Sequence, residues 1–270
     1  MLRHSGRYWW MMGRTTAMTA FLDALAFLTR LAPARPCSPA ALTRCVPWFA
    51  PVGLVLGCLC TAAASSGLAF LVTLPAYAAA QSCGLFLTAL LWLALELWIT
   101  RGLHWDGLAD LGDAVGAGGG RFWEILRDSR IGAFGALSLL VIFCGQWAAL
   151  AWHLGALHRF ELVLAPVWGR ACAVWLAASA PARAPDSLGG LVQAGASPAL
   201  ARLHGLAALL LAGLLCARGL GFYQSLVLLI GQYTLTRTLS AAAWRQGGLS
   251  GDFLGASIEL GQLWFLLATL

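Results

Sequence analysis

The sequence predicts an all-α polytopic integral membrane protein, and three observations lead to this fold class. Hydrophobic residues make up 60% of the 270-residue chain, charged residues only 10%, and the mean hydropathy is +0.78. Soluble globular domains are about 45–50% apolar and about 25% charged, so the chain lies far outside the soluble class. The apolar residues also occur in long runs, with most charges at the ends of the runs. We therefore expect residues 1–270 to form a single transmembrane domain.

The lengths of the apolar runs predict the number of membrane-crossing helices. A spanning helix needs about 20 mostly apolar residues, and on this basis we expect about seven spans. They fall at residues 47–74, 76–100, 131–157, 160–181, 203–217, 219–236 and 253–270. Residues 18–32 are too short and too charged to cross, so they predict an interfacial helix. Residues 1–17 are either a disordered segment or an extension upstream of a start at Met18.

The distribution of arginine predicts the orientation of these spans. All 17 basic residues are Arg, and cytoplasmic loops of membrane proteins carry an excess of basic residues. If the N-terminus is cytoplasmic, 14 of the 17 lie in segments on that side, which are 1–46, 101–130, 182–202 and 237–252. The C-terminus then lies on the opposite side. No basic patch interleaved with aromatic residues occurs, which argues against a nucleic-acid partner.

Five of the eleven acidic residues fall in the predicted cytoplasmic segment 101–130. Asp106, Asp110 and Asp113 are spaced so that they share one face of a helix. Three carboxylates on one face repel one another unless a cation neutralises them. Oxygen ligands without a His or Cys cluster suit Mg²⁺, which often links one or two carboxylates to substrate phosphates. We predict that these three residues are catalytic and bind Mg²⁺; the alternative is a solvated acidic loop.

A second group of candidate catalytic residues follows in the same segment. Arg127 and Arg130 flank Asp128 just before a predicted span. Guanidinium groups match the geometry of phosphate oxygens, so these residues are candidates for contacting a phosphate group. The alternative is that the two Arg only anchor the span at the membrane surface.

Further candidates lie in or near the predicted spans, and we expect them to bind substrate. Asp252 and Glu259 share a helical face, and we expect them to serve the same site as Asp106. Charged residues inside a bilayer are costly and are usually functional, which applies to Glu259 and Arg170. For Arg170 the alternative is a purely structural pair with an acid inside the membrane. His104 adjoins the acidic string, where it either contacts substrate or is structural.

Three ordered strings, which cover residues 102–110, 124–132 and 250–259, resemble the adenosylcobinamide-GDP ribazoletransferase (cobalamin synthase) family. Gly102-Leu103-His104-Trp105-Asp106-Gly107-Leu108-Ala109-Asp110 resembles the family's Gly-Leu-His-Leu-Asp-Gly-Leu-Ala-Asp. Glu124-Ile125-Leu126-Arg127-Asp128-Ser129-Arg130-Ile131-Gly132 is similar to its Glu-Ile-Met-Lys/Arg-Asp-Ser-Arg-Ile/Leu-Gly. The stretch from Ser250 to Glu259 resembles its Thr-Gly-Asp-x-x-Gly-Ala-x-x-Glu.

The resemblance implies a membrane enzyme of the last steps of cobalamin biosynthesis. Such an enzyme joins adenosylcobinamide-GDP to α-ribazole or its 5′-phosphate and releases GMP. It also implies a multi-pass protein of the bacterial inner membrane with a cytoplasmic active site, Mg²⁺ as cofactor and Arg183 among the substrate-binding residues. Whether the protein forms a homo-oligomer is left open.

The chain departs from the family pattern at several positions. Arg101 stands where the family usually has Gly, and Gly118-Gly119-Gly120 replaces a more charged stretch. Pro181-Ala182-Arg183 lacks the Tyr of the family's Pro-Tyr-Ala-Arg, and Ser250 replaces Thr. Two other functions remain as alternatives. One is a Mg²⁺-dependent membrane phosphotransferase of the CDP-alcohol type, although position 110 is Asp where that class has Arg. The other is a small-molecule transporter, which would place its polar residues mainly at the membrane midplane.

Overall fold

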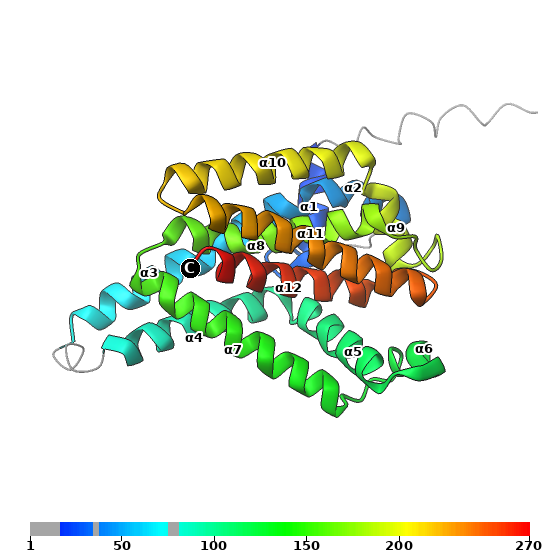
Figure 1. The fold of residues 1–270 in the computed structure, drawn as a ribbon, viewed down its shortest axis with the longest axis horizontal. Helices are drawn as coiled ribbons and strands as arrows, with labels where there is room; N and C mark the ends of the chain where they lie inside the picture. Colours follow the sequence, from blue (N-terminus) through cyan, green and yellow to red (C-terminus); the bar gives the residue numbers. More distant parts are fainter. Residues whose placement is uncertain (1–16, 35–37, 75–80) are drawn as a thin grey trace, which may run out of the picture.

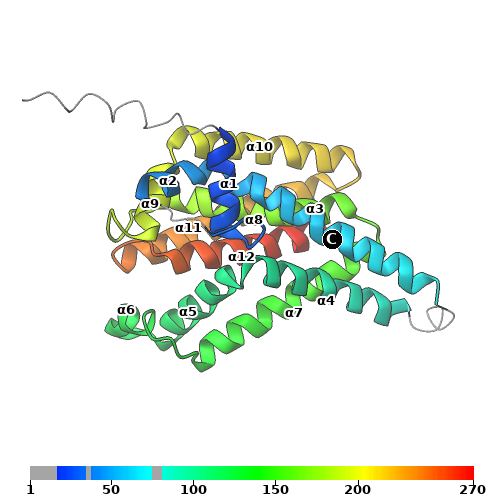
Figure 2. The ribbon, with the colours of Figure 1, turned by 180° about the vertical axis from the view of Figure 1, so that it is seen from behind.

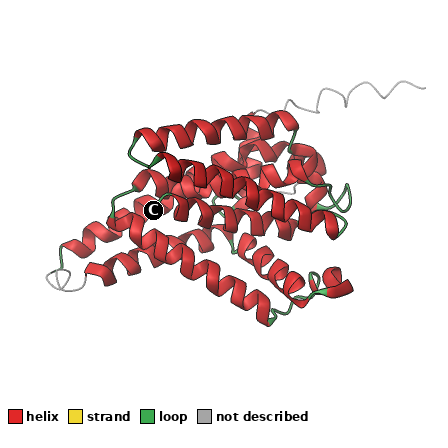
Figure 3. Ribbon diagram, viewed as in Figure 1, coloured by secondary structure: helices red, strands yellow, loops and turns green. Residues whose placement is uncertain are grey.

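The computed structural model describes residues 17–34, 38–74 and 81–270, and every regular element among them is a helix (Figure 3). The prediction for the first sixteen residues lies outside the described part. The α-helices are α1 (Ala17–Leu28), α2 (Pro39–Cys45), α3 (Phe49–Val72), α4 (Gln81–Thr100), α5 (Leu103–Ala117), α6 (Phe122–Ile125), α7 (Ala133–Gly155), α8 (Arg159–Ser179), α9 (Leu188–Gly195), α10 (Pro198–Ala217), α11 (Phe222–Arg245) and α12 (Gly251–Ala268). Two 3₁₀ turns, η1 (Val46–Trp48) and η3 (Gly119–Arg121), precede α3 and α6. The predicted all-α fold is confirmed.

Five helical stretches in the described chain are long and apolar enough to cross a membrane. They contain α3, α4, α7, α8 and α10, and each coincides with a predicted span. The other two predicted spans are occupied by α11 and α12. These helices have 24 and 18 residues, so they are long enough to cross, but polar side chains lower their hydropathy. The predicted interfacial segment forms the 12-residue helix α1.

The long helices lie side by side, with α8 and α12 at the centre of the bundle (Figures 1 and 2). The two central helices pack against each other, while α3 covers α8 and α5 covers α12. Close packing of α3 on α8 depends on Gly53 and Gly57, because a Cβ atom on Gly53 would lie 2.5 Å from the Pro166 carbonyl oxygen. Small residues four apart let membrane helices approach closely in this way.

The outer faces of the peripheral helices are apolar and exposed. Along α10, the exposed side chains include Leu203, Leu206, Leu209 and Leu210, each with 54–66% of its surface accessible. Soluble proteins rarely expose apolar patches of this extent, whereas such a surface is suited to contact with lipid tails. The exposed leucines therefore support the conclusion from composition that this is a membrane protein.

Three of the four segments predicted to be cytoplasmic, 101–130, 182–202 and 237–252, have helices or turns at one end of the bundle. In Figure 1 this end, on the right, contains α5 and α6, helix α9, and the turn between α11 and α12, while the C-terminus lies toward the other end. The side of the membrane that this end faces stays a prediction. The acidic segment is not a loop, however. It forms helix α5, which packs against α12 and α7.

Candidate functional site

Helix α5 begins after a sharp break in the backbone. Arg101 and Gly102 both adopt left-handed conformations, with φ of 61° and 66°, and they separate α5 from α4. The Asp106 N–H then donates to the Gly102 carbonyl oxygen at 2.9 Å and closes the first turn. A carboxylate in the first turn is favoured by the positive end of the helix dipole. The break therefore places Asp106 at the start of a helix rather than in the middle of one.

The three aspartates of α5 share one face, as the spacing predicts, but their environments differ. Asp106 is exposed, Asp110 is half-buried and Asp113 is buried. The apolar residues of α5, including Trp105 and Leu108, are buried in the bundle. The three carboxylates therefore lie on one face of α5, and their burial increases from the start of the helix to its end.

Asp113 is held by the start of α7. Its Oδ2 accepts a hydrogen bond from the Gly132 N–H at 2.6 Å, and its Oδ1 accepts one from the Gly135 N–H at 2.8 Å. These N–H groups lie at the start of α7, where backbone N–H groups have no acceptor within the helix itself. The carboxylate therefore caps α7, and it does not line the large cavity beside Asp106 and Asp110. Its predicted role as a metal ligand stays a prediction.

Asp252 lies beside α5 because α5 and α12 approach closely. A Cβ atom on Gly107 would lie 2.9 Å from the Asp252 Cα, and one on Gly255 would lie 3.2 Å from the His104 Cα. Asp252 stands in the first turn of α12 and accepts a hydrogen bond from the Ser250 hydroxyl at 2.9 Å. Asp252 and Asp106 line the same small cavity of about 90 Å³. The acidic stretches around Asp106 and Asp252, which are about 145 positions apart in the sequence, thus lie next to each other in the structure.

The aspartates act on one another electrostatically. Burial, together with the neighbouring carboxylates of Asp106, Asp252 and Asp113, raises the pKa of Asp110 to about 6. A cluster of like charges disfavours the ionised state in this way unless a cation is present. The donor set thus fits a hard divalent cation such as Mg²⁺.

The number of protein ligands is small for a metal site. In the part of the chain that the structure describes, no three His, Cys, Asp or Glu side chains converge closely enough to hold a metal ion by themselves. Mg²⁺ is commonly bound by one or two carboxylates together with substrate phosphates and water. Asp106 and Asp110, which face the large cavity, fit this arrangement.

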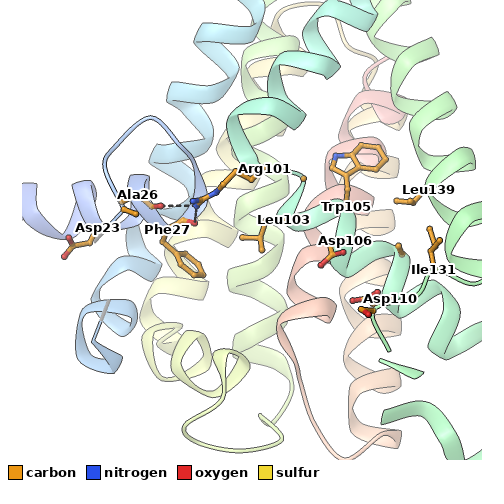
Figure 4. A pocket seen from close by; sticks show the side chains of 14 residues that line it. Asp23, Ala26, Phe27, Arg101, Leu103, Trp105, Asp106, Asp110, Ile131 and Leu139 are labelled. Carbon is orange, nitrogen blue, oxygen red and sulfur yellow. Dashed lines mark hydrogen bonds between the residues drawn. The ribbon is translucent and has the colours of Figure 1, made fainter. Parts of the chain in front are cut away.

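A cavity of about 850 Å³ adjoins Asp106 and Asp110 (Figure 4). Pockets for small molecules typically have volumes of about 300–1,000 Å³. Its other walls come from α1, from the junction of α4 and α5, and from the segment before α7. The lining residues are Asp23, Ala26, Phe27, Ala34, Arg101, Gly102, Leu103, Trp105, Asp106, Ala109, Asp110, Ser129, Ile131 and Leu139.

The Arg127–Arg130 segment lies at the edge of this cavity, which Ser129 lines. The Arg130 guanidinium pairs with the Asp128 carboxylate, with Nη2 to Oδ2 at 2.6 Å and Nε to Oδ1 at 2.9 Å. This pair lowers the pKa of Asp128 to about 2. Arg127 and Arg130 are exposed and do not line the cavity. Their predicted contact with phosphate stays a prediction.

His104, Arg170 and Glu259 belong to a buried polar network inside the bundle. The Arg170 guanidinium donates to Glu96 Oε1 at 3.0 Å and to Gln262 Oε1 at 3.1 Å. Gln146 donates to Glu259 Oε2 at 3.0 Å, and Glu259 lies 3.6 Å from His104 Nδ1. Within this network Arg170 forms its ion pair with Glu96 and not with Glu259.

This network lies away from the large cavity, and its members are almost completely buried. Arg170 has 0% of its surface exposed, and Glu96 and Glu259 have 1% each. The alternative interpretation of Arg170, a pair with an acid inside the membrane, matches this geometry. Of the three predicted residues, His104 lines the small cavity that Asp252 also lines.

Arg183 joins two segments at the same end of the bundle. Its guanidinium lies over the Trp123 ring, 3.6 Å from the centroid, and Trp123 Nε1 donates to the Gln246 carbonyl oxygen at 2.8 Å. Arg183 does not line the large cavity. It connects the segment after α8 to α6, which follows the carboxylate-bearing helix.

The sequence patterns missed several residues of the site. They mark Arg101 only as a departure from the family, yet it lines the cavity. Asp23 and Phe27 of α1 also line it. The charged Asp23 within an otherwise apolar amphipathic stretch is the signal that could have identified the α1 wall.

Comparisons with known proteins show the family to which the chain belongs. A family model described as Cobalamin-5-phosphate synthase matches residues 20–270. The chain belongs to this family. The match extends from α1 to α12, so it includes every element that lines the cavity. No solved structure matches the chain.

Several relatives carry the name adenosylcobinamide-GDP ribazoletransferase. The protein from Nitratidesulfovibrio vulgaris strain Miyazaki F is 42% identical over 257 residues, which are 93% of this chain and 94% of that protein. The protein from Frankia casuarinae is 36% identical over 77% of this chain and 78% of its own length. The protein from Laribacter hongkongensis is 35% identical over 93% of this chain and 96% of its own length. Membership of this family argues against both the CDP-alcohol type of phosphotransferase and the transporter.

Proposed function

We propose that this protein joins adenosylcobinamide-GDP to α-ribazole, or to α-ribazole 5′-phosphate, and releases GMP. The observation that carries the proposal is the meeting of Asp106 and Asp110 with Asp252 beside a cavity of about 850 Å³, in a chain of the cobalamin synthase family. The position of the cluster at the end rich in Arg supports a site on the cytoplasmic face of a bacterial inner membrane.

The reaction exchanges one bond to phosphorus for another. A ribose hydroxyl oxygen of α-ribazole attacks the phosphorus that carries the corrinoid arm. A new P–O bond forms to that oxygen, the bond from the same phosphorus to the bridging oxygen breaks, and the bridging oxygen leaves as part of GMP. The proton of the attacking hydroxyl passes to a carboxylate of the cluster. Phosphoryl transfer of this kind depends mainly on positioning and on neutralising charge.

The aspartates have separate parts in this scheme. Asp106 and Asp110 face the cavity and would hold Mg²⁺ together with the diphosphate. When bound, the ion neutralises charge on the diphosphate and on the departing GMP. Asp113 keeps α5 and α7 in register through its bonds to the start of α7. Asp252 is the carboxylate that α12 adds to the cluster.

Arg127 and Arg130 supply positive charge at the edge of the cavity. Arg130 is paired with Asp128 and is 87% exposed, so its guanidinium can be reoriented toward a bound phosphate with little loss of buried contacts. Surface ion pairs contribute only about 0–1 kcal/mol, so exchanging Asp128 for a phosphate group costs little.

The test is a direct assay of the purified protein in detergent or lipid nanodiscs. Adenosylcobinamide-GDP, α-ribazole and Mg²⁺ are added, and the release of GMP and the formation of the corrinoid product are followed by chromatography. We expect turnover that stops when EDTA removes Mg²⁺ and that is lost in Asp106→Asn and Asp110→Asn. Asp186→Asn, at an exposed acid outside the site, is the matched control and keeps full activity. Turnover by both site variants at saturating Mg²⁺ would contradict the assignment.

A further inference from the structure

The C-terminal end of α1 is fastened to the junction between α4 and α5. Arg101 Nη2 donates to the carbonyl oxygens of Ala26 and Phe27, at 3.2 and 3.1 Å. In addition, the Arg30 N–H donates to the Ile99 carbonyl oxygen at 2.8 Å. Figure 4 shows both bonds of Arg101, which cross from the junction to α1.

The two carbonyl groups have no partner within their own helix. In a continuing helix the N–H of Arg30 would bond to Ala26, and the N–H of Leu31 would bond to Phe27. Here the Arg30 N–H goes to Ile99, and the Leu31 N–H goes to the Thr29 hydroxyl at 3.1 Å. The Arg101 guanidinium therefore satisfies the last carbonyls of α1, which the end of a helix otherwise leaves free.

Arg101 achieves this from an unfavourable backbone conformation. Its φ of 61° lies in the left-handed region, where a residue with a Cβ atom is strained and glycine is not. The next residue, Gly102, has a similar φ and is free of this strain. A non-glycine residue at such a position indicates that its side chain is needed.

The helix that Arg101 fastens is a wall of the large cavity. Asp23, Ala26 and Phe27 of α1 line the cavity on the side opposite Asp106 and Asp110 (Figure 4). Helix α1 runs across the long helices rather than along them (Figures 1 and 2). Among the described residues that line this cavity, Arg101 is also the only cation.

We propose that Arg101 is a positioning residue, which holds α1 as the outer wall of the site for the diphosphate-bearing corrinoid substrate. This inference rests on the proposed function for its choice of substrate. Arg101 reaches the chemistry through α1, because its guanidinium is directed at α1 and not at the carboxylates. Loss of its side chain weakens binding of the larger substrate and leaves the carboxylate cluster in place.

The experiment compares Arg101→Gly with Arg101→Lys in the full-length protein. Glycine relieves the backbone strain, which offsets part of the loss of the two hydrogen bonds, so we expect a folded variant with a thermal midpoint close to that of the unchanged protein. We expect its KM for adenosylcobinamide-GDP to rise about tenfold, because substrate binding must then also order the released end of α1, while kcat stays within about twofold. Lysine has three donors on one nitrogen and restores most of the affinity.

Amide hydrogen exchange supplies a second measurement that does not depend on turnover. Exchange in residues 19–31 becomes faster in Arg101→Gly, because the end of α1 is released. Leu157→Gly is the matched control: Leu157 also has a left-handed φ, of 58°, but lies in the turn between α7 and α8. We expect Leu157→Gly to relieve the same kind of backbone strain and to change neither the KM for adenosylcobinamide-GDP nor the amide exchange of α1.

Two results would overturn the proposal. One is unchanged exchange of α1 in Arg101→Gly, whatever happens to the KM. The other is faster exchange of α1 with an unchanged KM. If the unchanged protein releases no GMP, the proposed function has failed, and the exchange measurement still decides whether Arg101 fastens α1.

Discussion

Gly107 of α5 packs against Asp252 of α12, and the two backbones are so close that a Cβ atom on Gly107 would lie 2.9 Å from the Asp252 Cα. Gly107 directly follows Asp106, so this contact sets the position of the Asp252 carboxylate relative to Asp106. The acidic strings of α5 and α12 can form one cluster only while the helices stay this close.

The first prediction concerns this contact. In Gly107→Ala the methyl group meets the backbone of α12, which cannot move as a flexible side chain can, so α5 and α12 must separate. Misplacing reacting groups by about 1 Å can reduce turnover by about 100-fold. We expect a loss of about this size in GMP release, with the protein still inserted in the membrane.

Gly205→Ala provides the control for that substitution. Gly205 lies in α10, and no atom lies within 4 Å of the position that a Cβ atom would take there. Alanine at this position therefore leaves activity unchanged and favours the helix slightly. Near-normal turnover in Gly107→Ala would show that the exact separation of α5 and α12 is unimportant.

Local periodicity made the carboxylate stripe predictable from the sequence. The positions of Asp106, Asp110 and Asp113 on one helical face follow from their spacing alone. The meeting of Asp252 with α5 followed from the arginine distribution, which places both at the same end of the bundle. Hydropathy located the spans, although α11 continues past the expected end at residue 236 to Arg245, because a helix can extend beyond the lipid into water.

Contacts between distant segments could not be predicted in the same way. Nothing near Asp113 indicates that its carboxylate turns toward the N–H groups of Gly132 and Gly135. The choice of Glu96 as the partner of Arg170 depends on how α3, which packs against both α4 and α8, places these two helices. The left-handed backbone of Arg101 likewise depends on the angle between α4 and α5, which no local pattern determines.

The second prediction separates the roles of two aspartates. Asp113→Asn loses the negative charge that accepts hydrogen bonds from the start of α7, and hydrogen bonds to charged groups contribute about 1.5–3 kcal/mol each. We expect its thermal midpoint to fall clearly. We also expect it to lose activity, and added Mg²⁺ not to restore that activity. Asp106→Asn is the comparison, because Asp106 is exposed: it loses activity without loss of stability. Equal midpoints for the two variants, measured by thermal unfolding in the same detergent, would argue against the capping role of Asp113.

The third prediction concerns pH and the metal-free protein. The pKa of Asp110 is raised from 3.8 to about 6 by burial and by Asp106, Asp252 and Asp113. A group whose pKa is higher in the folded state favours folding most when it is protonated. Its contribution to stability is therefore full below about pH 4, declines between about pH 4 and 6, and is lost above that range.

Asn is a neutral mimic of protonated Asp110, which allows a direct measurement. With EDTA present, we expect Asp110→Asn to unfold at a higher temperature than the unchanged protein at pH 8 and at the same temperature near pH 4. Asp186→Asn, at an exposed acid away from the cluster, is the control variant that is measured alongside. A difference between Asp110→Asn and the unchanged protein that does not vary over this range would show that the carboxylates do not repel one another.

The last prediction concerns the buried pair of Glu96 and Arg170, whose charged atoms lie 3.0 Å apart with 1% and 0% of the side chains exposed. Removing one partner leaves a buried charge unpaired, which typically costs about 3–5 kcal/mol, whereas replacing both with apolar residues is often neutral or better. We expect Glu96→Leu and Arg170→Met each to lower the thermal midpoint strongly, and the double variant to recover most of the loss. The exposed pair Arg121 and Glu124 is the control: its atoms are closer, at 2.7 Å, yet Glu124→Gln should leave the thermal midpoint almost unchanged, because solvent screens an exposed pair. If the double variant is as unstable as either single variant, the pair is needed for more than charge balance, through the bonds that Gln262 makes from α12 to both partners.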